Sequence, residues 1–155
     1  MDTIDPETAA RVWQRVRAHS PEPPHPECTT REVGLTELIA REWEAAATYL
    51  QLSRRFQGKQ NALLRKLAAQ EQAHAACLKG IYTLLTGKPP KMAGAPAVTD
   101  DTQTVLRRCY GRQMQCLALY EQRTTDPEYG HIFARLAQQE KEHCHHLLEL
   151  LGNLK

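Results

Sequence analysis

Two stretches of the chain nearly repeat each other. Residues 67–74 read LAAQEQAH and residues 136–143 read LAQQEKEH, so each contains Glu-x-x-His within an amphipathic helical pattern. At this spacing a carboxylate and an imidazole project from one helix face, where the apolar stripe should continue. Ionisable groups that face a core are unfavourable unless something compensates them, and a metal ion does so. The repeat predicts a metal site formed by Glu71, His74, Glu140 and His143.

The repeat extends to the helices that precede the two motifs. Tyr49 aligns with Tyr120, and no segment shows sustained strand alternation, so the chain is predicted to be all-α. Two copies of one helical hairpin form an antiparallel four-helix bundle with pseudo-twofold symmetry. The expected helices run from about residue 30 to Gly58, from Asn61 to Leu85, from Asp101 through Tyr120 and from Asp126 to about Gly152.

The connection between the hairpins is long. The segment Gly87–Asp101 is rich in proline and glycine and is expected to be a loop. A helix of ~25 residues is ~38 Å long, whereas this loop can reach ~50 Å when extended. It can therefore cross the full length of the bundle, which a simple up-down-up-down turn would not need.

The first 28 residues are predicted to lie outside the bundle, which occupies residues 29–155. Asp5-Pro6-Glu7 is typical of a helix start, and this helix is expected to end near Ala18. The segment Ser20–Pro26 contains four prolines and is expected to be a stiff linker. Because the helix is attached through this linker, we expect it to exchange between the subunits of a homodimer.

The charge of the chain argues against nucleic-acid or membrane partners. The formal net charge is +2, and the hydrophobic and charged fractions of 41% and 25% are ordinary. No apolar run approaches the ~20 residues of a membrane span, and the start Met1-Asp2-Thr3 is not a secretory signal. The cluster of basic residues is interpreted as a solvated helix end. It consists of Arg54, Arg55, Lys59, Arg65 and Lys66.

The cysteines indicate reduced thiols and a cytoplasmic location. There are five, an odd number, and no two are spaced Cys-x-x-Cys, so neither a disulfide framework nor a zinc ribbon is indicated. Most are expected to be small buried apolar residues. They are Cys28, Cys77, Cys109, Cys116 and Cys144.

A site for two divalent ions needs further carboxylates, because the ions bring four positive charges. Glu42 lies on the inward stripe of its helix with Leu38 and Ala46, and is the best candidate. The repeat places Gln113 at the corresponding position of the third bundle helix. Gln113 either binds the metal through its carbonyl oxygen or orients Glu140 without binding. Without metal, the buried Glu and His side chains would satisfy each other by hydrogen bonds.

The complete pattern resembles a known family. One Glu from each of two helices, with Glu-x-x-His from each of the other two, is the ligand set of ferritin-like di-iron carboxylate proteins. The amino-acid sequence from Glu42 to Tyr49, followed by the motif Glu71-x-x-His74, most resembles that of the rubrerythrin branch. The resemblance covers about residues 30–152. The resemblance implies a ferritin-like bundle that holds two iron ions. It makes Glu42 and His74 terminal ligands of one ion and His143 of the other, with Glu71 and Glu140 bridging.

The chain departs from this family at three points. Gln113 carries no charge, so the ion beside His143 should bind less tightly. Cys116 stands where some rubrerythrins have another carboxylate, and a thiolate ligand would favour zinc. A rubredoxin module with paired Cys-x-x-Cys motifs is absent from the sequence, so a separate electron donor is expected.

The resemblance implies a di-iron oxidoreductase that reduces peroxide or dioxygen, or oxidises ferrous iron. The alternative is a non-redox or degenerate bundle that holds one zinc or iron ion, which Gln113 favours. A third interpretation is a bundle that serves only as an interaction module. Tyr49 and Tyr120 are interpreted as core residues with bonded hydroxyl groups, rather than as redox residues or as residues that orient the metal ligands.

Overall fold

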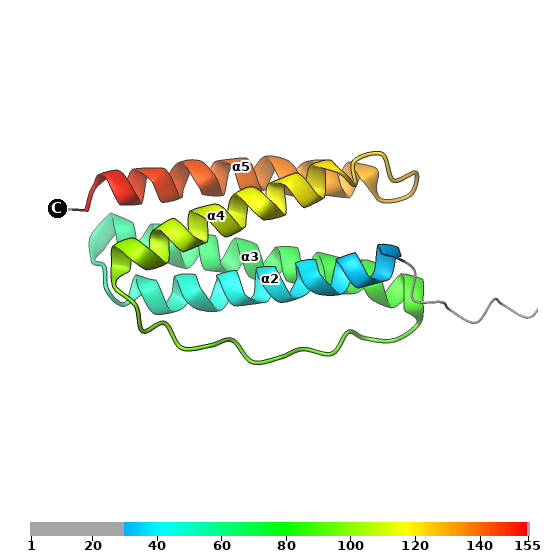
Figure 1. Ribbon diagram of the computed structural model, residues 1–155, viewed down its shortest axis with the longest axis horizontal. Coiled ribbons are helices and arrows are strands. Elements are labelled where there is room, and N and C mark those ends of the chain that lie inside the picture. Colours follow the sequence, from blue (N-terminus) through cyan, green and yellow to red (C-terminus); the bar gives the residue numbers. More distant parts are fainter. Residues whose placement is uncertain (1–29, 155) are drawn as a thin grey trace, which may run out of the picture.

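The computed structural model describes residues 30–154, which form four helices, with side-chain detail from Gly34 onward (Figure 1). These are α2 (Thr30–Ser53), α3 (Gly58–Thr86), α4 (Thr102–Glu121) and α5 (Gly130–Gly152). The described part of the chain contains no strand, so the prediction of an all-α four-helix bundle is confirmed. The N-terminal helix and linker predicted in residues 1–28 lie outside the described range. Among the described helices, none combines the length and apolar character needed to cross a membrane.

The bundle consists of two helical hairpins. Helices α2 and α3 run close together along their length, as do α4 and α5, whereas the backbones of the two hairpins approach each other closely at few points (Figure 1). Apolar side chains fill two separate clusters inside the bundle. One contains Leu38, Leu78 and Leu136, and the other contains Leu52, Leu64 and Leu147. Along each helix, the predicted ligand positions lie between the residues of these two clusters, so the ligands form a polar layer enclosed by apolar packing.

The connection from α3 to α4 runs along the whole bundle, as its length predicted (Figure 1). Its start is a left-handed turn at Gly87, whose N–H donates to the Thr83 carbonyl at 2.8 Å. Side chains of α2 hold the loop in place: Gln51 accepts a hydrogen bond from the Val98 N–H at 2.8 Å, and Arg55 donates to the Val98 carbonyl at 3.1 Å. The crossover therefore covers one side of the bundle.

Two helix starts differ from the sequence-based expectation. Gly58, expected to end the first bundle helix, is instead the first residue of α3 and has a φ of 58°. This left-handed backbone is accessible to glycine without strain, which allows a tight turn after Ser53. Asp126, expected to open the last helix, accepts hydrogen bonds from the N–H groups of Glu128 and Tyr129, both at 2.9 Å. Its side chain stabilises a turn, and α5 begins at Gly130.

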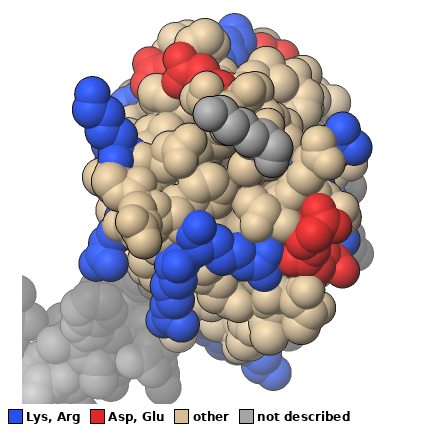
Figure 2. All heavy atoms as spheres, turned by 90° about the vertical axis from the view of Figure 1, so that its left-hand side faces the viewer, with Lys and Arg blue, Asp and Glu red and all other residues tan. Residues whose placement is uncertain are grey.

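The end of the bundle that carries the α2–α3 turn is not a uniformly basic surface. Figure 2 shows lysine and arginine side chains across this end together with acidic groups and large uncharged areas. The five basic residues of the cluster defined from the sequence are all exposed. This agrees with their interpretation as a solvated helix end.

Candidate metal centre

All four helices contribute to one buried polar layer in the middle of the bundle. Helix α2 provides Glu42, α3 provides Glu71 and His74, α4 provides Gln113, and α5 provides Glu140 and His143. Each of these six side chains is at most 3% exposed. The structure therefore brings together every residue for which the sequence predicted a ligand position, at the level where the two hairpins face each other.

Both histidines turn the Nδ1 atom toward the carboxylates. His74 Nδ1 lies 2.9 Å from Glu140 Oε1, 3.1 Å from Glu71 Oε2 and 3.5 Å from Glu42 Oε2. His143 Nδ1 lies 3.1 Å from Glu71 Oε1 and 3.7 Å from Glu140 Oε2. Glu71, His74, Glu140 and His143 each offer one ligand atom within 4.8 Å of the others. The pair of imidazole rings is stacked, with centroids 5.5 Å apart.

The hydroxyl group of each tyrosine forms a hydrogen bond with a candidate ligand from the other hairpin. Tyr120 of α4 donates its hydroxyl hydrogen to Glu42 of α2, and Gln113 of α4 donates from Nε2 to the Tyr49 hydroxyl of α2 at 2.8 Å. Gln113 Nε2 also donates to Glu71. Both tyrosines are fully buried, and burial raises the pKa of both hydroxyls, so they remain protonated. Both hydroxyls are bonded, as expected of core residues, but Tyr120 bonds to a candidate ligand, which is the role that the sequence interpretation placed second.

Two glutamines that the sequence reasoning did not select contact the histidines from outside the layer. His74 Nε2 lies 2.8 Å from Gln139 Oε1, and His143 Nε2 lies 3.1 Å from Gln70 Oε1. An amide oxygen only accepts hydrogen bonds, so each Nε2 carries the hydrogen, and in the neutral ring Nδ1 keeps its lone pair. The two glutamines could have been found from the sequence repeat, because both motifs extend to Gln-Glu-x-x-His.

We expect Gln139→Ala to weaken metal binding by about 10–100-fold, the usual effect of removing a hydrogen-bond partner of a histidine ligand. Without the amide, neither the orientation nor the tautomer of His74 is held. Metal titration with a competing chelator measures the change. Gln138→Ala is the matched control, because Gln138 is the neighbouring residue and is exposed. Unchanged affinity in Gln139→Ala would contradict this role.

In the metal-free layer, both imidazoles are positively charged. Burial alone would lower the histidine pKa values, but the contacts with Glu140, Glu42 and Glu71 raise the pKa of His74 to about 12. Contacts with Glu140 and Glu71 likewise outweigh burial and raise the pKa of His143 to about 9. Burial and the charge of Glu71 raise the pKa of Glu42 well above its usual value. The histidines thus partly replace the positive charge that a metal would bring.

The layer fits a metal ion. Several buried polar atoms have no partner in hydrogen-bonding geometry among the described residues, although carboxylates and imidazoles face one another at short range. These atoms are Glu71 Oε2, His74 Nδ1, Gln113 Oε1 and both carboxylate oxygens of Glu140. Imidazole nitrogen and carboxylate oxygen together suit iron and zinc. Buried polar atoms without hydrogen-bond partners are rare in proteins, so these atoms indicate that the layer binds a metal ion.

Cys116 does not join the group of converging ligand atoms found in the described residues. Its side chain is buried, and burial raises its pKa, as it raises the pKa of Cys109 to about 12. Both are therefore neutral thiols in the metal-free protein. Cys144 is buried as expected, whereas Cys77 is partly exposed.

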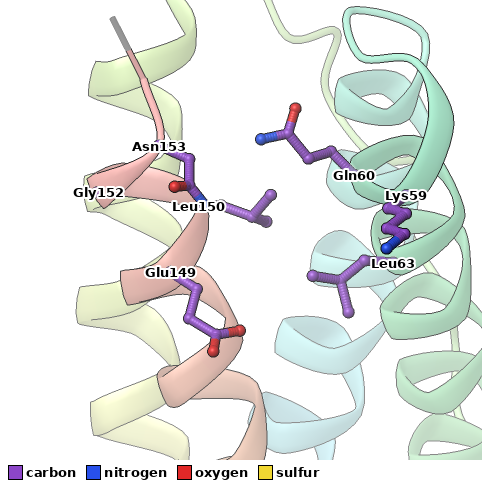
Figure 3. A pocket seen from close by; sticks show the side chains of 7 residues that line it. All are labelled: Lys59, Gln60, Leu63, Glu149, Leu150, Gly152 and Asn153. Atoms are coloured by element: carbon purple, nitrogen blue, oxygen red, sulfur yellow. The ribbon is translucent and has the colours of Figure 1, made fainter.

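A separate cavity of about 600 Å³ opens at the end of the bundle between the start of α3 and the end of α5 (Figure 3). Figure 3 shows Lys59, Gln60 and Leu63 facing Glu149 and Leu150 across it. None of the six candidate ligands lines this cavity. It is therefore distinct from the polar layer.

Comparisons with known proteins agree with the polar layer. A solved structure of an iron-soaked variant of the ferritin PmFTN is 15% identical to this chain, with a TM-score of 0.61. The similarity covers 78% of this chain and 85% of that chain, and at this identity it shows a shared fold. No curated protein sequence matches the chain significantly. The family model described as Rubrerythrin matches residues 34–151. The chain therefore belongs to the rubrerythrin family, within the ferritin-like di-iron superfamily.

Proposed function

We propose that the protein is a di-iron oxidoreductase that reduces peroxide or dioxygen, or oxidises ferrous iron. The observation that carries the proposal is the buried layer of six side chains, in which Glu and His atoms from both hairpins converge without full hydrogen bonding. Membership of the rubrerythrin family supports iron as the metal. Iron, when bound, would supply the electron-transfer chemistry.

The residues around the ions would have distinct roles. Glu42 and His74 would hold one ion, Gln113 and His143 the other, and Glu71 and Glu140 would bridge them. Tyr120 holds the carboxylate of Glu42 by a hydrogen bond, so that this ligand is oriented before metal enters. The apolar clusters pack against the layer on both sides along the bundle. The protein would thereby set the spacing of the two ions.

Metal content after anaerobic reconstitution with ferrous iron tests the proposal. We expect about two irons per chain, as the ligand number suggests, and a change of the absorption spectrum when peroxide is added. A single zinc or iron ion without oxidation would support the alternative below. No bound metal would contradict the central claim.

A second candidate function is non-redox binding of a single ion, and the hydrogen bonding of Gln113 favours it. This side chain is neutral, and its Nε2 donates to Glu71, a carboxylate needed as a bridge. A site with three carboxylates neutralises two divalent ions less well than a site with four. In this interpretation the site binds one ion tightly, and His143 and Gln113 serve as hydrogen-bonding partners instead of ligands.

We expect Gln113→Glu to tighten binding at the weaker metal position by about tenfold or more, since it adds a negative charge next to the second ion. The measurement is a titration with ferrous iron or cobalt, with stoichiometry from elemental analysis. Gln115→Glu is a suitable control, because Gln115 lies on α4 and is exposed. If Gln113→Glu leaves both stoichiometry and affinity unchanged, the two-ion interpretation is wrong.

The proposal implies partners beyond this chain. We propose that a separate protein in the cytoplasm donates electrons to this chain. We also propose that the chain forms a homodimer in which the helix predicted from the sequence of residues 1–28 is exchanged. Light scattering on the full chain and on a chain without residues 1–28 tests the dimer. A full chain that is monomeric would contradict it.

A further inference from the structure

A small cavity connects the candidate metal centre with the space between α2 and α4. Its volume is about 20 Å³, and its lining includes Glu42, Tyr49 and Gln113 at the metal layer. Arg41 and Arg112 also line it, with side chains 29% and 45% exposed. We call it the inner cavity. It therefore extends from buried ligand positions to side chains that reach solvent.

A second cavity, which we call the outer cavity, adjoins the inner one beneath the crossover. Its volume is about 170 Å³, and residues 96–100 of the crossover form part of its wall. Thr48, Cys109 and Arg112 line both cavities, so the two are neighbours at these side chains. The outer cavity lies next to the inner one, and the inner one borders the metal layer.

The size and the chemistry of the inner cavity limit what it can admit. About 10–15 Å³ is enough for one water molecule, so a space of about 20 Å³ admits a ligand of two or three atoms. Gln113 borders the cavity and is 3% exposed, and its Oε1 has no hydrogen-bond partner within the described residues. At the solvent side, Arg41 pairs with Glu37 at 2.8 Å and Arg112 pairs with Glu44 at 3.2 Å. These guanidinium groups therefore make the mouth of the inner cavity polar without a net charge of their own, which suits a small polar ligand.

We propose that ligands of two or three atoms, the oxidant among them, reach the metal centre through the outer and inner cavities in series, and that Gln113 borders their binding position. This inference rests on the proposed metal centre. Replacing the family's carboxylate by a neutral amide removes a strong ligand on the side that the cavity reaches. The presence of glutamine at position 113 thus weakens metal binding at one position and leaves room there for a small ligand.

Azide binding to the cobalt-loaded protein tests this entry path, with imidazole as a bulkier comparison. Ala45 lines the inner cavity. In Ala45→Phe the larger side chain should fill this cavity, because the surrounding protein is closely packed, so we expect azide association to slow by about tenfold or more. Ala47→Phe is the matched control, since Ala47 is partly buried on the same helix and lines neither cavity. Cobalt content is measured for each variant, and azide association is followed by stopped-flow absorption.

The outcomes separate the entry path from the metal centre itself. Slower azide association in Ala45→Phe with cobalt content unchanged supports the path, as does azide binding to the unmodified protein much faster than imidazole. Equal azide rates in Ala45→Phe and Ala47→Phe, or imidazole binding as fast as azide, would overturn it. If Ala45→Phe does not fold, Thr48→Leu, at the junction of the two cavities, decides in the same way. Failure of the unmodified protein to bind cobalt would instead contradict the proposed function.

Discussion

Loading the protein with ferrous iron under anaerobic conditions will raise its unfolding temperature by about 10 °C. Iron at 1,000 times its dissociation constant adds about 4 kcal/mol to the free energy of unfolding for one site. For a domain of this size each kcal/mol corresponds to about 2–4 °C. The effect is large because three candidate ligands come from each hairpin. A bound ion therefore links the two halves of the bundle.

Thermal unfolding followed by circular dichroism, with and without a chelator, measures this stabilisation. Glu140→Gln keeps the shape of the side chain but removes its charge, so most of the iron-dependent shift should disappear. Glu142→Gln makes the same change two residues away on an exposed part of α5 and should keep the shift. An equal shift in both variants would mean that iron stabilises the protein from somewhere other than the polar layer.

Metal binding at pH 7 will release at least two protons per chain, because each imidazolium must lose the proton on Nδ1 to bind. The raised pKa of Glu42 makes its carboxyl group a further source of protons. The pKa of His74 is raised to about 12 and that of His143 to about 9, so both rings are charged at pH 7 without metal. Protons therefore compete with iron. The overall binding constant should fall by at least about 100-fold for each pH unit below 7, since each released proton contributes about tenfold.

The free energy of unfolding of the metal-free protein should fall as the pH rises, whereas the metal-binding constant rises. A histidine whose pKa is raised on folding stabilises the folded state fully below its unfolded pKa of about 6.5. That contribution is lost as the pH rises through the folded pKa, first for His143 near 9 and then for His74 near 12. Raising the pH from 6.5 to 9 should therefore destabilise the metal-free form while it strengthens metal binding.

Calorimetric titration with metal in two buffers of different ionisation enthalpy counts the released protons. His145→Ala is a useful control, because this histidine lies on α5 close to the site but is exposed, with a side-chain exposure of 73%. Its removal should leave the proton count unchanged, whereas His143→Ala should lower the count by about one. A count near zero in the unmodified protein would mean that the histidines are already neutral, or that they do not bind the metal.

Much of the fold was predictable because its signals are local. A period of 3.6 residues marks each helix, and two copies of the same text mark two hairpins, so the four-helix bundle with its long crossover followed from the sequence. Helix starts were less predictable. Asp126 forms a turn within its own four residues, and Gly58 adopts a left-handed backbone at the start of α3. Both residue types serve equally well in a turn and at a helix end.

The candidate ligands were also predictable, since Glu and His on an apolar stripe are unfavourable without compensation, and the stripe can be read from spacing alone. Partners across the two hairpins were not. Gln139 contacts His74 and Gln70 contacts His143, and Tyr120 contacts Glu42, all between residues more than 60 positions apart. The same holds for the cavities, whose walls combine α2, α4 and the crossover. The sequence by itself determined the helices and the residues of the polar layer, because these depend on periodicity along one chain segment. Only the tertiary structure decided which side chains orient the histidines and where a small ligand can enter, because both depend on how the two hairpins face each other.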